Sequence, residues 1–171
     1  TNDTGENILG GITAKNLLKN ITDIVIKQQA ESLRILSIIE KKLEEHKIFI
    51  IDESQISKTQ EQYLKDFFIQ TVSPALVTII LNDLAEFPIL KDTSGYLAVK
   101  LVMKSDKKDQ SSIKKTSEIR YAVIEIPKSI NRFVVLPSDS ENQYIIMLDD
   151  VIRHNLSRIF NIFNYKTVSA H

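Results

Sequence analysis

Three consecutive runs decide the fold: IRYAVIEIP (Ile119–Pro127), RFVVLP (Arg132–Pro137) and YIIMLDDVIRHNLSRIF (Tyr144–Phe160). β-Branched and aromatic residues fill the first two runs, and a proline ends each of them, which predicts short strands. The third run changes from strand-like to helix-like at Asp149, whose carboxylate we expect to cap the helix. Strands and helices in this order predict an α+β fold, with two helices packed on a mixed β-sheet.

Working outward, the alternating segment Tyr96–Met103 matches the run Arg120–Ile126. Two such runs around a polar loop, Lys104–Ser117, predict a hairpin with a long tip. Ile48–Ile51 is short and wholly apolar, which predicts a buried strand. Further strands are expected at Val77–Leu81, Phe133–Leu136, Gln143–Met147 and Lys166–Ala170.

A long helix is predicted from Ala14 to about Glu45, because this range contains no Gly or Pro and Thr13 can cap it. Its apolar residues cover more than one narrow stripe, so the helix needs neighbours on several sides. We therefore expect it to have lost bundle partners upstream. A second helix opens on the capping box of Ser57 and Gln60 and ends at Pro74.

Composition narrows the function. Hydrophobic residues make up 43% of the 171 residues, which is typical of a globular chain, and 22 basic residues balance 22 acidic ones. A net charge of zero gives no electrostatic reason to expect nucleic acid as a partner. There are no cysteines, and no apolar run approaches the ~20 residues that span a bilayer. We expect a cytoplasmic location, with both ends cut from a longer chain.

Candidate chemistry is sparse. The glycines cannot build a phosphate-binding loop; they are Gly5, Gly10, Gly11 and Gly95. Asp150 and His154 could reach one metal from one helical face, but zinc sites use more ligands, so a solvated histidine is the favoured interpretation. His46 follows a charged helix end, His171 has no visible context, and Arg132 is expected to brace a carbonyl or a carboxylate. We predict no catalytic, cofactor-binding or metal residue.

The loop Lys104–Ser117 and its flanks carry a local surplus of positive charge. A solvated tip is the favoured interpretation, and weak, salt-sensitive contact with a polyanion is the alternative. The charged residues are Lys104, Lys107, Lys108, Lys114, Lys115 and Arg120 against Asp106, Asp109 and Glu118.

Read in order, HKIFIIDESQIS (His46–Ser57), FPILKD (Phe87–Asp92), GYLAVKL (Gly95–Leu101) and the three runs quoted first resemble the head domain of bacterial polyphosphate kinases that work through a phosphohistidine. The resemblance implies that residues 1–46 are the last helix of an N-terminal helical domain and residues 47–171 the head, or middle, domain. The chain departs from the family pattern at three places. It has Val77-Thr78-Ile79 where Leu-Thr-Pro is common in the family, it lacks the glycine that is common near Asn161–Asn164, and its Lys104–Ser117 loop is longer.

The family's phosphohistidine, its arginines for metal and polyphosphate, and its nucleotide-contacting asparagine lie in other domains. The resemblance therefore implies a non-catalytic structural and dimerisation part of a transferase. The parent would be a nucleotide-binding phosphoprotein that reversibly moves the terminal phosphate of ATP to polyphosphate, with magnesium. Expected partners are the remaining domains and a second copy, with polyphosphate only weakly bound and membrane association open for the parent.

Two alternatives remain open from the residues. The chain could be a stand-alone protein-interaction module whose long helix docks on a partner. It could also be a small enzyme that uses His154 and Asp150.

Overall fold

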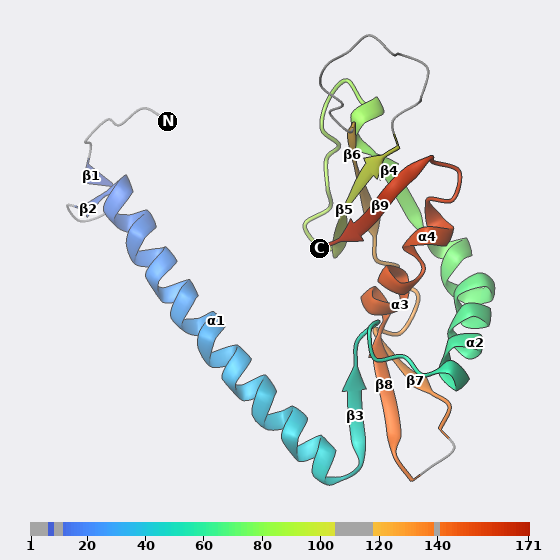
Figure 1. Ribbon diagram of the computed structural model, residues 1–171. Helices are drawn as coiled ribbons and strands as arrows, with labels where there is room; N and C mark the ends of the chain where they lie inside the picture. The colour runs from blue at the N-terminus through green and yellow to red at the C-terminus, as the bar shows by residue number, and fades with distance from the viewer. Residues whose placement is uncertain (1–6, 9–11, 105–117, 139–140) are drawn as a thin grey trace. The chain divides into compact units, whose positions relative to one another are not determined.

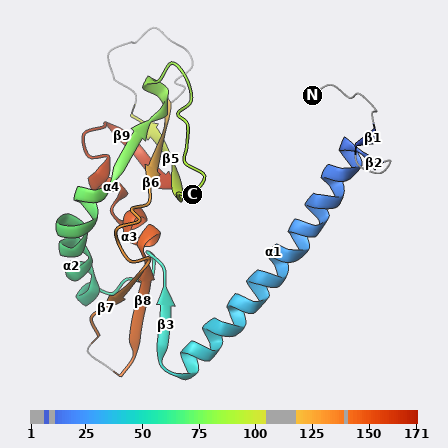
Figure 2. The same ribbon diagram turned by 180° about the vertical axis from the view of Figure 1, so that it is seen from behind.

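The structure, a computed structural model, describes residues 7–8, 12–104, 118–138 and 141–171. The chain divides into two compact units, Thr1–Lys47 and Ile48–His171 (Figures 1 and 2). Each unit is built differently, and each is described by itself.

The first unit is dominated by one helix. Strands β1 (Asn7–Ile8) and β2 (Ile12–Thr13) pair antiparallel and lead directly into α1 (Ala14–Glu45). The hydroxyl of Thr13 accepts a hydrogen bond from the Asn16 amide at 3.3 Å, which confirms the predicted cap. The helix ends at His46, and the next residue, Lys47, takes a positive φ of 59°, a conformation that stops a helix.

Four strands of the second unit form an antiparallel sheet in the order β4-β6-β5-β9. The predicted hairpin is confirmed as its centre, because Leu97 lies opposite Ile124 and Val99 opposite Ala122. The tip at residues 105–117 lies outside the described residues. The strands are β4 (Val77–Ile80), β5 (Tyr96–Met103), β6 (Ile119–Glu125) and β9 (Tyr165–Ala170).

The other three strands form a separate mixed sheet in the order β3-β8-β7. β3 (Ile48–Ile51) runs parallel to β8 (Gln143–Met147), and β7 (Phe133–Leu136) runs antiparallel to it. The prediction of a strand at Ile48–Ile51 is confirmed, but the prediction that it is buried was wrong, since only Ile51 is buried. The strand lies at an edge of its sheet, where a wholly apolar run is covered on one face only.

The second helix, α2 (Lys58–Phe67), begins at the predicted capping box. The Gln60 amide donates to the Ser57 hydroxyl at 3.4 Å, and the Ser57 amide donates back to the Gln60 side chain at 3.0 Å. The helix continues into a wider π turn, η1 (Phe68–Val72), and a 3-10 turn, η2 (Ser73–Ala75), that contains Pro74. Proline thus ends the helical segment as predicted.

The third predicted helix is two short helices, α3 (Leu148–His154) and α4 (Leu156–Ile159). Asp149 does not cap it; α3 already begins at Leu148, and Asp149 lies in its first turn. The break falls at the buried residue Asn155, whose side-chain amide donates to the Val151 carbonyl at 2.9 Å. A side chain that bonds back to the preceding turn replaces a backbone bond, which explains the interruption.

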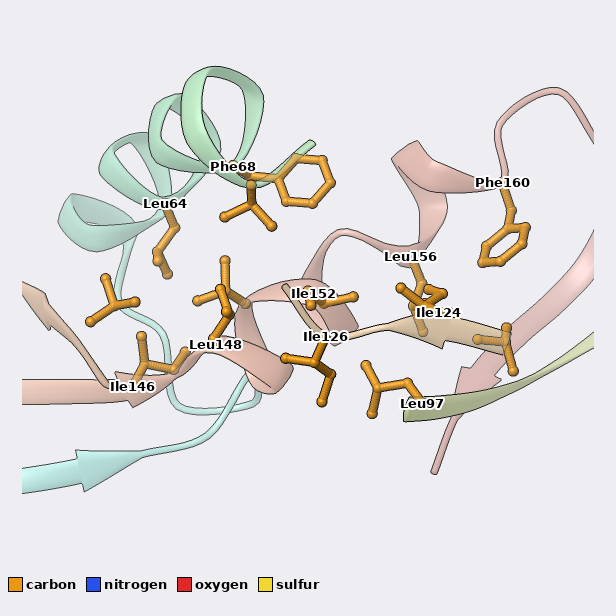
Figure 3. Close-up of a cluster of buried hydrophobic side chains, with 14 of the residues drawn as sticks. Leu64, Phe68, Leu97, Ile124, Ile126, Ile146, Leu148, Ile152, Leu156 and Phe160 are labelled. Atoms are coloured by element: carbon orange, nitrogen blue, oxygen red, sulfur yellow. The ribbon is translucent and has the colours of Figure 1, made fainter. Parts of the chain in front are cut away.

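Both sheets share one hydrophobic core, which Figure 3 shows in close-up. Leu64 and Phe68 from the α2 segment face Ile146 and Leu148, and Leu156 extends the cluster toward the four-stranded sheet. The sequence from β8 through α3 and α4 to β9 therefore links the two sheets through buried side chains. The predicted α+β class is confirmed, with the strands divided between two sheets.

Candidate interaction surface

The three-stranded sheet has two apolar faces, because β3, β7 and β8 are almost wholly apolar in sequence. The pairing register assigns each residue to a face, since neighbours across strands share a side. The inner face consists of Phe49, Ile51, Val134, Leu136, Tyr144 and Ile146. The outer face consists of Ile48, Ile50, Phe133, Val135, Ile145 and Met147, with Gln143 at one end.

Only the inner face is covered. All its residues belong to the core cluster or pack against it, whereas no apolar residue of the outer face does so among the described residues. Phe133 is 57% exposed and Val135 64% exposed. Contiguous apolar surface of this kind marks interaction sites in soluble proteins. The outer face is therefore the leading candidate for contact with another polypeptide.

β7 adds an open edge to this face. β8 is the strand that pairs with β7 in the described part of the chain, so the other edge of β7 has unpaired backbone groups. Open edges accept strands from partner chains unless they are blocked. Pro137 directly follows the strand and limits such pairing to a four-residue stretch.

A second apolar surface lies on α1. None of its residues is buried, and ten large apolar side chains are more than two-fifths exposed. They are Leu18, Ile21, Ile24, Val25, Ile26, Leu33, Ile35, Leu36, Ile38 and Ile39. This agrees with the predicted need for neighbours and identifies a second candidate contact surface, within the first unit.

A cluster of charges lies at the start of α3, where the covered side of the sheet meets the core. Arg153 donates to Asp149 at 3.2 Å and also pairs with Asp150. Arg132, in the loop before β7, lies 3.8 Å from the other oxygen of Asp149, as expected of a residue that braces a carboxylate. Sequence reasoning missed the pairing role of Arg153, which its i,i+3 and i,i+4 spacing from the two aspartates could have indicated.

Asp150 is the carboxylate that this cluster perturbs most. Burial and then the charge of Asp149 raise its pKa from 3.8 to about 6, although Arg153 opposes both effects. A hydrogen bond with Glu53, in the loop after β3, also favours the protonated form. The cluster thus joins α3, β7 and the β3–α2 loop, and we interpret it as a structural junction.

The structure does not join Asp150 and His154 into a site. Asp150 is held by Arg153, while His154 lines a polar cavity beside α2. The described ranges contain no group of three His, Cys, Asp or Glu side chains that could hold a metal ion. His46 is the C-cap residue of α1, and His171 forms two backbone hydrogen bonds of 2.9 Å with Ala98, which extends the pairing of β9.

The cationic surplus predicted around Lys104–Ser117 falls mostly on residues outside the described ranges. Arg120, at its end, pairs with Glu118 at 2.8 Å and lies 3.9 Å from Asp83. No helix within the described ranges is both long enough and apolar enough to cross a membrane.

The family model and the related proteins that match this chain describe the same family. A family model described as the polyphosphate kinase middle domain matches residues 59–171. A polyphosphate kinase of Yersinia pestis is 32% identical over 167 residues, and one of Escherichia coli K12 is 30% identical over 165 residues. These alignments cover 94% and 92% of this chain, and the chain spans 22% of the length of each relative.

A solved structure supports the same assignment. The crystal structure of the polyphosphate kinase of Porphyromonas gingivalis matches with a TM-score of 0.74 at 26% identity. The match covers 90% of this chain and 23% of that one. The similarity in sequence and in structure therefore concerns the same limited part of much longer proteins.

Proposed function

This chain belongs to the polyphosphate kinase family through its middle domain, and we propose that it acts as a structural and dimerising module of such an enzyme. The outer face of the three-stranded sheet carries this proposal, since its six apolar residues stay outside the core cluster and two of them, Phe133 and Val135, are more than half exposed. A surface of this kind is stable in water only when a partner covers it. The proposed partner is a second copy of this chain or another domain of the parent protein.

We further propose that the parent enzyme transfers the terminal phosphate of ATP to polyphosphate, with magnesium bound by other domains. Phosphoryl transfer needs cationic clamps for the spread negative charge and an in-line nucleophile. The described residues of this chain do not converge on such an arrangement, so we assign no step of the reaction to them. The role proposed for α1 is that of the last helix in a helical N-terminal domain.

Sedimentation velocity tests the contact role. The unmodified chain is expected to dimerise, and the double substitution Phe133→Lys with Val135→Glu is expected to return it to a monomer, because charges on the outer face oppose its burial. The matched control is Val77→Glu with Tyr121→Lys on the four-stranded sheet, where both side chains are similarly exposed. If the variant of Phe133 and Val135 still dimerises and the variant of Val77 and Tyr121 does not, the contact lies on the four-stranded sheet and the proposal is contradicted.

A second variant separates the two apolar surfaces. Leu36→Glu with Ile39→Lys places charges on α1 while keeping good helix formers. Loss of dimers with this pair alone would assign self-association to α1. An entirely monomeric unmodified chain would contradict self-association through either surface.

Catalytic independence is tested by supplying the purified chain with ATP, magnesium and a short polyphosphate primer. We expect neither ADP nor longer polyphosphate to form. Turnover by the chain alone would refute the non-catalytic role.

A further inference from the structure

A polar cavity of about 260 Å³ lies between α2 and the α3–α4 segment, and none of its lining residues belongs to the three-stranded sheet. Figure 1 shows these helices next to each other on one side of the second unit. The cavity is lined by Glu61, Lys65, His154, Asn155, Ser157 and Arg158. Its volume corresponds to several water molecules at about 30 Å³ each, which is enough for a small ion with part of its hydration.

Arg158 is unusual among the arginines of this chain. The sequence contains five, and four of them pair with carboxylates: Arg34, Arg120, Arg132 and Arg153. Arg158 has no ion pair within the described residues, although it projects from a helix that packs against the core. Arginine is the side chain that best recognises planar or tetrahedral oxyanions, because its fork donates two parallel hydrogen bonds.

Two other basic side chains share the cavity. Lys65 comes from α2 and His154 from the end of α3, and neither has a side-chain hydrogen bond or ion pair in the part of the chain described. Against them stands one carboxylate, Glu61. The lining therefore carries a net charge of +1 with neutral His154 and +2 with charged His154, whereas the whole chain has a net charge of zero.

Arg158 also lines a neighbouring cavity of about 350 Å³. There it lies with the hydroxyl-bearing side chains of Ser73 and Thr78, and the remaining lining residues are apolar: Phe68, Ile69, Leu76 and Ile159. Arg158 therefore lies between two cavities, of which one contains basic side chains and the other contains hydroxyl donors. This arrangement suits a ligand that has two linked anionic groups.

We propose that this groove binds an oxyanion of the phosphate class, with a diphosphate bound more tightly than a single phosphate. Arg158 contacts both groups, Lys65 neutralises the first and the His154 ring donates a hydrogen bond to it, and the hydroxyls of Ser73 and Thr78 donate to the second. The site shares no residue with the outer face of the three-stranded sheet. The outcome of a binding test at this site therefore does not change the proposed contact role.

Amide chemical shifts of the isotopically labelled chain measure this binding. Sodium pyrophosphate and sodium phosphate are titrated at constant ionic strength, with sodium chloride as the reference salt. We expect saturable shifts confined to Lys65, Ser73 and residues 154–158, and tighter binding of pyrophosphate than of phosphate. Shifts that match those in chloride, or that follow every surface lysine, would overturn the site.

A third probe, ADP, distinguishes the two sources of a diphosphate. Equal affinity for ADP and pyrophosphate shows that the phosphates alone are recognised, whereas tighter binding of ADP shows that a nucleotide is the ligand. If neither ADP nor pyrophosphate binds, the proposal is refuted.

Substitutions test each charge. Arg158→Gln and Lys65→Gln should each weaken pyrophosphate binding by about fivefold, as expected for partly solvated charges. Glu61→Gln should strengthen binding by a similar factor, because it removes the opposing carboxylate. Lys58→Gln, on the same helix but outside both cavities, is the control and should leave affinity unchanged.

Unchanged shifts in the two sheets establish that each variant folds. Equal affinity in all four variants would refute the assignment even if pyrophosphate binds.

Discussion

The two sheets of the second unit differ in the residues on their outer faces and in how those faces are covered. In the four-stranded sheet, inward-facing Leu97, Val99 and Leu101 alternate with Ala98 and Lys100. The paired strands give the outer face a mixed character, with polar Glu125, Thr167 and Ser169 beside apolar Val77, Ile79, Ile119 and Val123. In the three-stranded sheet, the outer face carries six apolar residues with one glutamine at its end. A face that carries charged and hydroxyl side chains tolerates contact with water, whereas a face without them favours burial against a partner.

Local structure also covers the four-stranded sheet. The segment before β5 is fastened to the outer face at Glu125, which accepts a hydrogen bond from Ser94 at 2.8 Å and lies 3.5 Å from Lys91. The Ser94 hydroxyl in particular, helped by Lys91, lowers the pKa of Glu125 below its ordinary value. The Lys91 amide also donates to the Tyr96 hydroxyl at 3.0 Å. The described residues supply no comparable cover for the three-stranded sheet.

The largest predicted effect is a difference in the free energy of unfolding between substitutions on the inner and outer faces of β8. Ile146 is 0% exposed on the inner face, and its neighbour Ile145 is half-buried on the outer face. Ile146→Ala should lower the free energy of unfolding by about 3–4 kcal/mol, because it leaves a cavity in the core. Ile145→Ala should lower it by only about 1 kcal/mol. Urea unfolding, at a concentration where the chain is monomeric, measures both, and equal losses would remove the distinction between the faces.

The next effect concerns the charge cluster that joins the three-stranded sheet to α3. Because the pKa of Asp150 is raised from 3.8 to about 6 in the folded state, the folded chain holds an extra proton between these values. The stability that this protonation contributes is present below pH 4 and is lost as the pH rises through 6. The loss should amount to roughly 3 kcal/mol at most, at about 1.4 kcal/mol per pKa unit.

Asp150→Asn removes this titration. Urea unfolding from pH 4 to pH 7 should show the variant gaining stability relative to the unmodified chain as the pH rises. Asp92→Asn, which removes a carboxylate from an exposed loop, is the matched control. A difference between Asp150→Asn and the unmodified chain that stays constant with pH would contradict the raised pKa.

A smaller effect is expected at the start of α2, which covers the inner face of the three-stranded sheet. Ser57→Ala removes the hydroxyl that accepts from the Gln60 amide, and should lower the free energy of unfolding by about 1 kcal/mol. Ser57→Gly should lower it by only a few tenths of a kcal/mol, because glycine leaves the helix start open to water. Thermal unfolding compares the two, and the reverse order would rule out capping as the cause.

The smallest effect should fall on the outer face of the four-stranded sheet. Lys91→Ala removes an ion pair with Glu125, but the lysine side chain is 70% exposed. Exposed pairs contribute little because water and salt screen them. Thermal unfolding should detect no change, and a clear loss would show that this loop contributes to covering the sheet through its lysine.

Local patterns in the sequence predicted most elements correctly. The caps at Thr13 and Ser57 depend on side chains within three residues of the bonds they make, and the hairpin of β5 and β6 depends on alternation within each strand. The cap predicted at Asp149 failed because α3 begins one residue earlier, at Leu148, and Arg153 engages the Asp149 carboxylate. The ion pair with Arg153 could not be read from the capping pattern alone.

The candidate surfaces were less accessible to sequence reasoning. The apolar surplus on α1 followed from helical periodicity, but the outer face of the three-stranded sheet did not, because β3 and β7 lie about eighty residues apart in the chain. The cavity that brings Lys65 next to Arg158 likewise joins residues from distant helices. Contacts of this kind are set by which helices pack together.

By itself, the sequence determined where most helices and strands lie, since propensity, periodicity and caps act over a few residues. It also determined that α1 carries more apolar surface than one neighbour can cover. Only the tertiary structure decided that the seven strands of the second unit form two sheets, which face of each sheet is covered, and which charges meet at Asp150. Those outcomes depend on packing between segments far apart in the chain, where burial changes both the free energy of an apolar face and the pKa of a carboxyl group.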